Sequence, residues 1–166
     1  MTNSVFHGIG TDRSTFRNMG SNVLGAAVFA LTAAFAWIPV VGYFAWLIPL
    51  VMLFREKKSL LLRFYCSEAL MIGVVRLLFD VVFNSIARIA QQTVALYGQN
   101  PDFIAFYGDI TNPGSGALLI GGILAGILTL FSLLLAFLAY MRIPVRIPGI
   151  APLCRGIAEF RFTGKK

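Results

Sequence analysis

The feature that most constrains this chain is a pair of long apolar runs without a single charged residue, Val23–Phe54 and Ala117–Met141. About 20 apolar residues in a helix are enough to cross the hydrocarbon core of a bilayer. Apolar residues make up 58% of the whole chain and charged residues only 13%, about half the charged share of a soluble domain. A soluble fold of this size would lack polar surface, so we predict one all-α integral membrane domain.

The first apolar run is too long for one straight helix, which would measure about 48 Å against a hydrocarbon core of about 30 Å. The stretch Pro39-Val40-Val41-Gly42 interrupts it with the two strongest helix breakers. We therefore predict a helical hairpin with arms Val23–Ile38 and Tyr43–Phe54. Each arm is short for a full span, so the hairpin either crosses a thinned bilayer or re-enters on the same side. Aromatic residues near the break are of the kind that lie at membrane interfaces: Trp37, Tyr43 and Trp46.

The distribution of Lys and Arg predicts the topology of the remaining segments. Arg55–Lys58 and the tail from Arg142 are basic, whereas Thr93–Gly116 contains no Lys or Arg. Because basic flanks stay in the cytoplasm or its equivalent, the segment between them must cross the membrane. We expect a four-helix protein with both termini on the cytoplasmic side and a short surface helix near Asn100–Tyr107. The full division is a polar leader at 1–22, membrane helices at 23–38, 43–54, 60–92 and 117–141, and a basic tail at 142–166.

The segment Leu60–Gln92 carries charges that a membrane helix normally avoids. Within its embedded part, Ala69–Arg88, the aliphatic and phenylalanine residues favour insertion by about 3 to 7 kcal/mol, whereas Arg76 and Asp80 together oppose it by about 5 to 7 kcal/mol. Arg76, Asp80, Asn84 and Arg88 follow at four-residue spacing, so they form one polar stripe in which Arg76 and Asp80 can pair. Such a stripe faces protein or water. It either joins the helix to its neighbours, docks a partner or lines a hydrophilic path.

Other candidate sites are structural. Gly122 and Gly126 are spaced for close helix packing, which we expect within the chain rather than in a dimer. We expect Arg63, Phe64 and Glu68 at the inner interface, and Arg142 and Arg146 against lipid headgroups. The two cysteines, Cys66 and Cys154, are expected to be free thiols on the inner side.

Catalysis, cofactors and metals find little support in this sequence. The only histidine is His7, and no carboxylate cluster accompanies it. Ser67 beside Glu68 lacks the base that a nucleophile needs. We therefore expect no enzyme activity, no cofactor and no metal. The net charge is +7, but the Lys and Arg residues lie in patches beside apolar runs, as residues that set membrane topology do. We therefore expect no nucleic-acid binding.

The order of these features resembles the Tic-twenty-like membrane protein family, which comprises a chloroplast inner-envelope import component and bacterial relatives. The resemblance covers roughly Val23 to Pro148. It is carried by the run Arg63-Phe64-Tyr65-Cys66-Ser67-Glu68-Ala69-Leu70 at the start of the long helix. Relatives commonly have a His-Ala pair at Tyr65-Cys66 and Gln at Glu68. The resemblance implies a four-helix membrane protein and, for the plant member, participation in protein translocation.

These observations favour a small subunit or scaffold of a larger membrane assembly, with protein translocation as the activity that the resemblance adds. The alternative is a stand-alone small transporter or channel with a polar path along Arg76, Asp80 and Asn84. The expected partners are the lipid bilayer and membrane proteins, and a homo-oligomer stays open. The expected location is a bacterial inner membrane or an organelle inner membrane.

Overall fold

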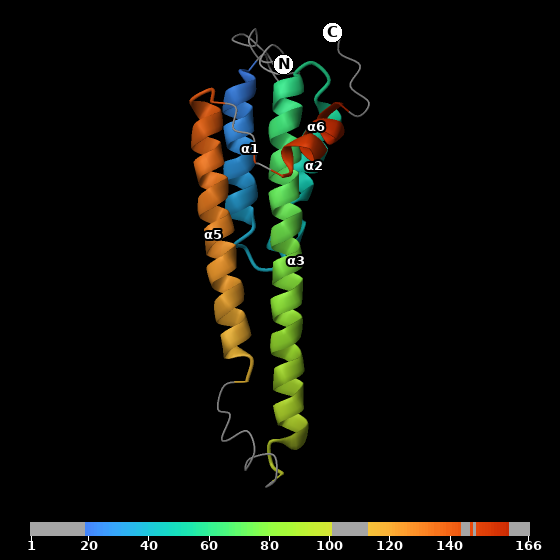
Figure 1. Ribbon diagram of the computed structural model, residues 1–166, viewed down its shortest axis with the longest axis vertical. Coiled ribbons are helices and arrows are strands. Elements are labelled where there is room, and N and C mark those ends of the chain that lie inside the picture. The colour runs from blue at the N-terminus through green and yellow to red at the C-terminus, as the bar shows by residue number, and fades with distance from the viewer. Residues whose placement is uncertain (1–18, 101–112, 144–146, 148, 160–166) are drawn as a thin grey trace. The chain divides into compact units, whose positions relative to one another are not determined.

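The computed structural model describes residues 19–100, 113–143, 147 and 149–159, which form helices joined by turns and short irregular segments. No β-strand occurs among these residues, which confirms the predicted all-α class. The described residues form five α-helices, labelled in Figure 1, and a short 3₁₀-helix, η1, precedes the second of them. Their bounds are α1 (Ser21–Phe35), η1 (Val41–Phe44), α2 (Leu47–Arg55), α3 (Leu60–Tyr97), α5 (Ser115–Tyr140) and α6 (Ala151–Glu159).

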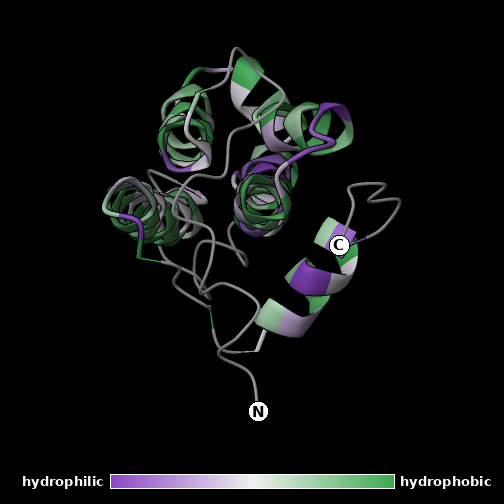
Figure 2. Cartoon of the chain, turned by 90° about the horizontal axis from the view of Figure 1, so that it is seen from above, coloured by the Kyte–Doolittle hydropathy of each residue, from purple (hydrophilic) through white to green (hydrophobic). Residues whose placement is uncertain are grey.

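Two of the helices are long and apolar enough to cross a membrane, by length and composition. α3 has 38 residues and α5 has 26, so they measure about 57 Å and 39 Å. Seen from above, both are coloured mainly as hydrophobic (Figure 2). α1 and α2 have 15 and 9 residues, about 22 Å and 14 Å. The four predicted apolar segments are therefore two long helices and two short ones.

The described chain divides into two compact units, whose boundaries fall within α3 and α5. The first unit comprises Met1–Val74 and Thr129–Lys166 and holds α1, α2, α6 and one end of each long helix. The second unit, Val75–Leu128, holds the remaining parts of α3 and α5.

In the first unit, α1, η1 and α2 form a hairpin alongside the beginning of α3. The Ser21 hydroxyl donates a hydrogen bond of 2.8 Å to Ser59 Oγ, so the start of α1 lies at the start of α3. Gly73 of α3 lies against Thr32 and Trp46, one from each arm of the hairpin. Because α3 rises about 1.5 Å per residue, Gly73 lies about 20 Å from the start of α3. α1 and α2, about 22 Å and 14 Å long, are each shorter than a hydrocarbon core of about 30 Å, which favours the re-entrant alternative over two full crossings.

The turn of this hairpin is tight and strained. Val40 has φ 67° and ψ −51°, and the amide of Val41 donates to the Pro39 carbonyl at 2.8 Å. Together these define a γ-turn with positive φ, a rare conformation that a β-branched residue seldom adopts. A Cβ atom on Gly42 would lie 2.6 Å from the Ala36 carbonyl oxygen, so only glycine fits there. The predicted break is therefore real, although α1 ends at Phe35 rather than at Ile38.

The C-terminal helix α6 was not predicted, because the sequence assigned 142–166 to a basic tail. Cys154 and Ala158, four residues apart and therefore on one face, are buried, whereas Leu153 and Arg155 are exposed. On the exposed face of α6, Arg155 donates a hydrogen bond of 2.8 Å to Glu159. This amphipathic spacing was a signal for a helix that the tail's many Arg and Pro residues obscured. The predicted surface helix near Asn100–Tyr107 falls almost wholly on 101–112 and lies outside the described residues.

Candidate functional site

The start of α3 is stabilised by side chains that also join it to α1 and α2. Ser59 precedes the helix, and its Oγ accepts the amide of Leu62 at 3.1 Å, a helix cap. The buried carboxylate of Glu56 accepts the amides of Lys58 at 2.8 Å and Ser59 at 3.0 Å. The basic stretch Arg55–Lys58 therefore contains, besides its exposed cations, a buried carboxylate that the sequence analysis overlooked.

Arg63 connects this start of α3 to α6. Its guanidinium is buried, and Nε donates to the Ala158 carbonyl at 2.6 Å while Nη1 donates to the Glu56 carbonyl at 3.0 Å. Ala158 lies in the last turn of α6, where carbonyl groups have no partner within the helix. A cation at a helix C-terminus also interacts favourably with the helix dipole. Arg63 therefore holds α6 and the α2–α3 connection against the same turn of α3.

Glu68 lies one turn further along α3, and its side chain is also buried. The Ile147 amide hydrogen-bonds to its carboxyl group, while Oε1 of Glu68 and the hydroxyl of Tyr65 have no hydrogen-bond partner among the described residues. Cys154 of α6 lies close to Glu68. Burial, with a smaller contribution from the charge of Glu68, raises the pKa of the Cys154 thiol to about 11. Cys66 and Cys154 are both free and buried.

The structure shows the surroundings of Arg63, Phe64 and Glu68, the residues that we expected at the inner membrane interface. All three are buried, as is every residue from Leu61 to Ala69. A helix that is buried on all sides over nine residues is surrounded by protein, here with contacts from the α2–α3 connection and α6. We call Glu56, Ser59, Arg63 and Glu68 the entry cluster. Its contacts hold the elements of the first unit together.

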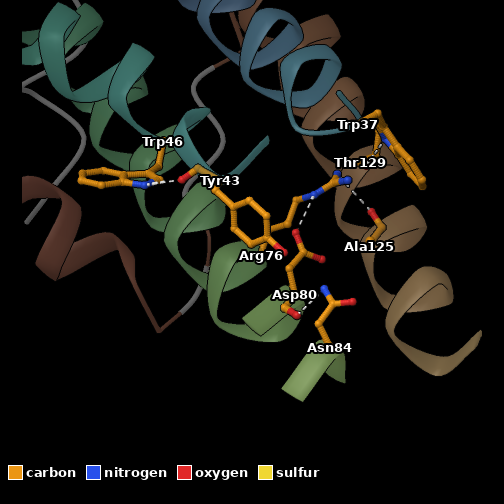
Figure 3. A network of polar contacts seen from close by, with 8 residues as sticks. All are labelled: Trp37, Tyr43, Trp46, Arg76, Asp80, Asn84, Ala125 and Thr129. Atoms are coloured by element: carbon orange, nitrogen blue, oxygen red, sulfur yellow. Dashed lines mark hydrogen bonds and ion pairs between the residues drawn. The ribbon is translucent and has the colours of Figure 1, made fainter. Parts of the chain in front are cut away.

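The predicted polar stripe lies in the second unit and begins with the expected pair (Figure 3). Arg76 Nε is 3.9 Å from a carboxylate oxygen of Asp80, four residues on. Arg76 is only 7% exposed, and its Nη1 also donates to the Ala125 carbonyl of α5 at 3.5 Å. The Asn84 amide donates to the Asp80 carbonyl of its own helix at 2.7 Å. Arg88, the last member of the stripe, is exposed.

The stripe therefore turns progressively away from α5. Arg76 at one end contacts that helix and Arg88 at the other end is exposed. Successive residues at four-residue spacing rotate about 40° around a helix, which explains this drift. Of the three interpretations, the contact of Arg76 with α5 supports helix joining most directly.

Aromatic residues at the hairpin turn have partners within the first unit. The Trp37 indole donates to Thr129 Oγ1 of α5 at 3.0 Å, and the Trp46 indole donates to the Tyr43 carbonyl at 2.9 Å (Figure 3). Thr129 lies near the middle of α5 rather than at an end. Both indole N–H groups therefore have partners within the protein.

The predicted glycine contact in α5 is wrong in position. A Cβ on Gly122 or Gly126 would meet nothing within 4 Å, whereas one on Gly121 would lie 2.9 Å from Cβ of Phe83. Packing between α3 and α5 in the second unit therefore uses Gly121. It also uses Gly114, where a Cβ would lie 2.8 Å from the backbone of Ala87.

The predicted headgroup contacts are only partly described. Arg142 is exposed and has φ 62° at the end of α5. Its amide donates to Ala139 and that of Ile143 donates to Leu138, a C-terminal cap that usually contains glycine. Arg146 lies outside the described residues.

In the ranges that the structure covers, no group of three or more His, Cys, Asp or Glu residues could hold a metal ion. No family model, no curated protein and no solved structure matches this chain.

Proposed function

We propose that this chain is a small integral membrane subunit that acts as a scaffold within a larger membrane assembly. α3 and α5 span the bilayer in this proposal, and the α1–α2 hairpin enters from the cytoplasmic side and returns. Both termini then lie on the cytoplasmic side of a bacterial or organelle inner membrane. The exposed cations Lys57 and Lys58 at the start of α3 fit that side.

The observation that carries this proposal is the exposed apolar turn of a hairpin that is too short to span. Val40 is 71% exposed and Phe44 is 58% exposed, and both lie in non-helical or 3₁₀ backbone. Irregular backbone at membrane depth is tolerated where protein covers it or where it lines a water-filled cavity. An apolar turn does not suit a water-filled cavity. A neighbouring membrane protein is therefore the better cover, as the scaffold function requires.

The family resemblance suggests that the larger assembly functions in protein translocation, and this activity forms part of the proposal. The alternative of a stand-alone transporter or channel finds less support. Arg76 is engaged by Asp80 and by a carbonyl of α5, and the Asn84 amide is bonded to its own helix. A polar path would instead present such groups to water or to a substrate.

A purification from the native membrane in mild detergent tests the proposal, with size analysis and mass spectrometry of the proteins that remain bound. We expect a complex of fixed composition with the wild-type chain. Phe44→Ser should dissociate it, whereas Ile127→Ser, an equally exposed apolar residue of α5, should leave it intact. A chain that purifies alone and conducts ions or solutes in liposomes would contradict the scaffold and support the transporter.

A further inference from the structure

The helix α6 has three faces of different character. Cys154 and Ala158 are buried against the first unit, whereas Arg155 and Glu159 form an exposed ion pair. The third face is apolar and at least partly exposed, and it consists of Ile150, Leu153 and Ile157. We call these three residues the α6 stripe. Leu153 at its centre is 58% exposed.

Helical geometry fixes the angles between these faces. At about 100° per residue, the members of the α6 stripe fall within about 60° of one another. Ile150 precedes the helix, but its carbonyl accepts the Cys154 amide at 2.9 Å, so it follows the same spacing. The centre of the stripe lies about 90° from the buried face and about 170° from the charged pair. α6 therefore has an apolar side and a charged side that are opposite each other, with the protein contact between them.

Two side chains of α3 hold α6 at a defined level. Arg63 donates to the Ala158 carbonyl at 2.6 Å, near the end of α6. The carboxyl group of Glu68 accepts the Ile147 amide. The carbonyl of Ile147 in turn accepts the amide of Ala151, the first residue of α6, at 3.1 Å. Both ends of α6 are therefore linked to the first three turns of α3.

The orientation of α6 differs from that of α3. Seen from above, the beginning of α3 is viewed nearly end-on, whereas α6, beside the label of the C-terminus, lies across the view (Figure 2). If α3 crosses a bilayer, α6 lies close to the plane of that bilayer.

The level of α6 matches a bilayer surface. Arg63 and Glu68 lie about 5 Å and 12 Å from the start of α3, and the exposed Lys58 comes just before that start. In the proposed insertion Lys58 lies among the lipid headgroups, so α6 lies about 5 to 12 Å deeper. The headgroup layer on each side of a bilayer is about 5 to 8 Å thick. α6 therefore lies where the headgroups meet the acyl chains.

A helix at this level has one side toward the acyl chains and the opposite side toward water. The charged pair of α6 is unfavourable within hydrocarbon, so the α6 stripe is the side that suits the acyl chains. An apolar face opposite a charged face is the pattern of helices that lie in a membrane interface. Because one Arg and one Glu leave the charged face without net charge, the stripe rather than headgroup charge provides the attraction.

We propose that α6 is an interfacial helix that inserts the α6 stripe into the cytoplasmic surface of the bilayer, between the headgroups and the acyl chains. This inference rests on the proposed function, because it uses the same insertion of α3. The hydrogen bond from Arg63 to Ala158 then joins a surface helix to a spanning helix.

Two residues on opposite sides of α6 provide a matched test with nitroxide labels on introduced cysteines. The purified chain is placed in phosphatidylcholine liposomes, and collisions are measured with oxygen, which favours lipid, and with a water-soluble nickel chelate. We expect the ratio of oxygen to nickel collisions to be at least tenfold higher for Leu153→Cys than for Arg155→Cys. Ile157→Cys should behave like Leu153→Cys. The wild-type chain gives the background, since its two thiols are buried.

Equal ratios at positions 153 and 155 would overturn the inference, because the α6 stripe would not face lipid. Low collision rates with both reagents at position 153 would overturn it too, because protein rather than lipid would then cover the stripe.

Extraction of native membranes with alkaline carbonate separates this inference from the proposed function. If the chain is released, membrane insertion fails and both proposals fall. If the chain is retained but the label at position 153 behaves like the label at position 155, only the interfacial helix falls.

Discussion

At the residue scale, the fold depends on a few buried polar side chains that each serve several elements. Arg63 donates to carbonyl groups on α6 and on the α2–α3 connection, and Ser59 caps α3 while it accepts from Ser21 of α1. Burial of a polar group is unfavourable in free energy unless the group is hydrogen-bonded. Each of these hydrogen bonds therefore favours one arrangement of the helices. Removal of one such side chain should therefore release a particular element.

Arg63→Ala should detach α6 from α3. The loss of two hydrogen bonds from a charged donor removes about 3 to 6 kcal/mol, which raises the detached population at least tenfold. The thiol of Cys154, now buried in α6, should then react with maleimide at least ten times faster. Arg155→Ala is the matched control on the same helix, because its ion pair with Glu159 is exposed. If both variants label at the wild-type rate, Arg63 does not hold α6.

Val40→Gly should stabilise the protein. Glycine adopts positive φ without the steric strain of a β-branched residue, a difference of about 1 to 3 kcal/mol, less about 0.5 to 1 kcal/mol of additional chain entropy. We expect a net gain of about 1 kcal/mol in thermal unfolding in detergent, followed by tryptophan fluorescence. Val41→Gly, at an exposed neighbour within η1, should instead destabilise by about 0.5 to 1 kcal/mol. Equal losses in both variants would show that Val40 is not strained.

At the scale of the elements, the sequence predicted which helices exist better than how they contact one another. Apolar run length and the Pro39–Gly42 break located α1, α2, α3 and α5 to within a few residues. The sequence predicted a close helix contact at Gly122, whereas α3 contacts α5 at the neighbouring residue, Gly121. The spacing of small residues does not tell which side of a helix faces a neighbouring helix. α6 was missed because its helix depends on tertiary contacts of Cys154 and Ala158 with α3, and short helices are marginal alone.

Two adjacent glycines of α5 test the helix contact. Gly121→Leu should destabilise by about 1 to 3 kcal/mol, because its Cβ would press on Cβ of Phe83, which lies too close to the backbone to move freely. Gly122→Leu should be nearly neutral, because nothing lies within 4 Å of its Cβ position. Thermal unfolding in the same detergent compares them. If Gly122→Leu lowers the free energy of unfolding more than Gly121→Leu does, the result would support the helix contact at Gly122 and Gly126 that the sequence suggested.

The four-residue spacing correctly predicted one side-chain contact of the site, the pair that Arg76 and Asp80 form within α3. Neutralising one partner leaves the other charge poorly compensated, so Arg76→Gln and Asp80→Asn should each destabilise, the former more because it also loses the Ala125 carbonyl. In a double-mutant cycle, the double variant should lose less free energy of unfolding than the two single variants lose together, by at least about 1 kcal/mol. Additive losses would mean that the two charges do not interact.

At the scale of the whole molecule, the apolar runs were enough to predict an all-α chain with helices suited to a membrane. The entry cluster was not predictable in the same way. Arg63 and Glu68 look like interfacial charges in the sequence, but both are buried, and Arg63 contacts α6 and the α2–α3 connection. Whether the hairpin crosses or returns depends on the short lengths of α1 and α2, and the sequence predicted the second arm, Tyr43–Phe54, as longer than the helix Leu47–Arg55 that the structure has.

The depth of the hairpin turn in a bilayer tests the account most directly, and the chain provides its own probes. It has two tryptophans, Trp37 and Trp46, and both lie at the turn. In liposomes of the purified chain, fluorescence should be quenched most by lipids brominated near the ends of their acyl chains, and Trp46→Phe should leave Trp37 with the same profile. Strongest quenching by lipids brominated near the headgroup would place the turn at an interface and contradict a re-entrant hairpin.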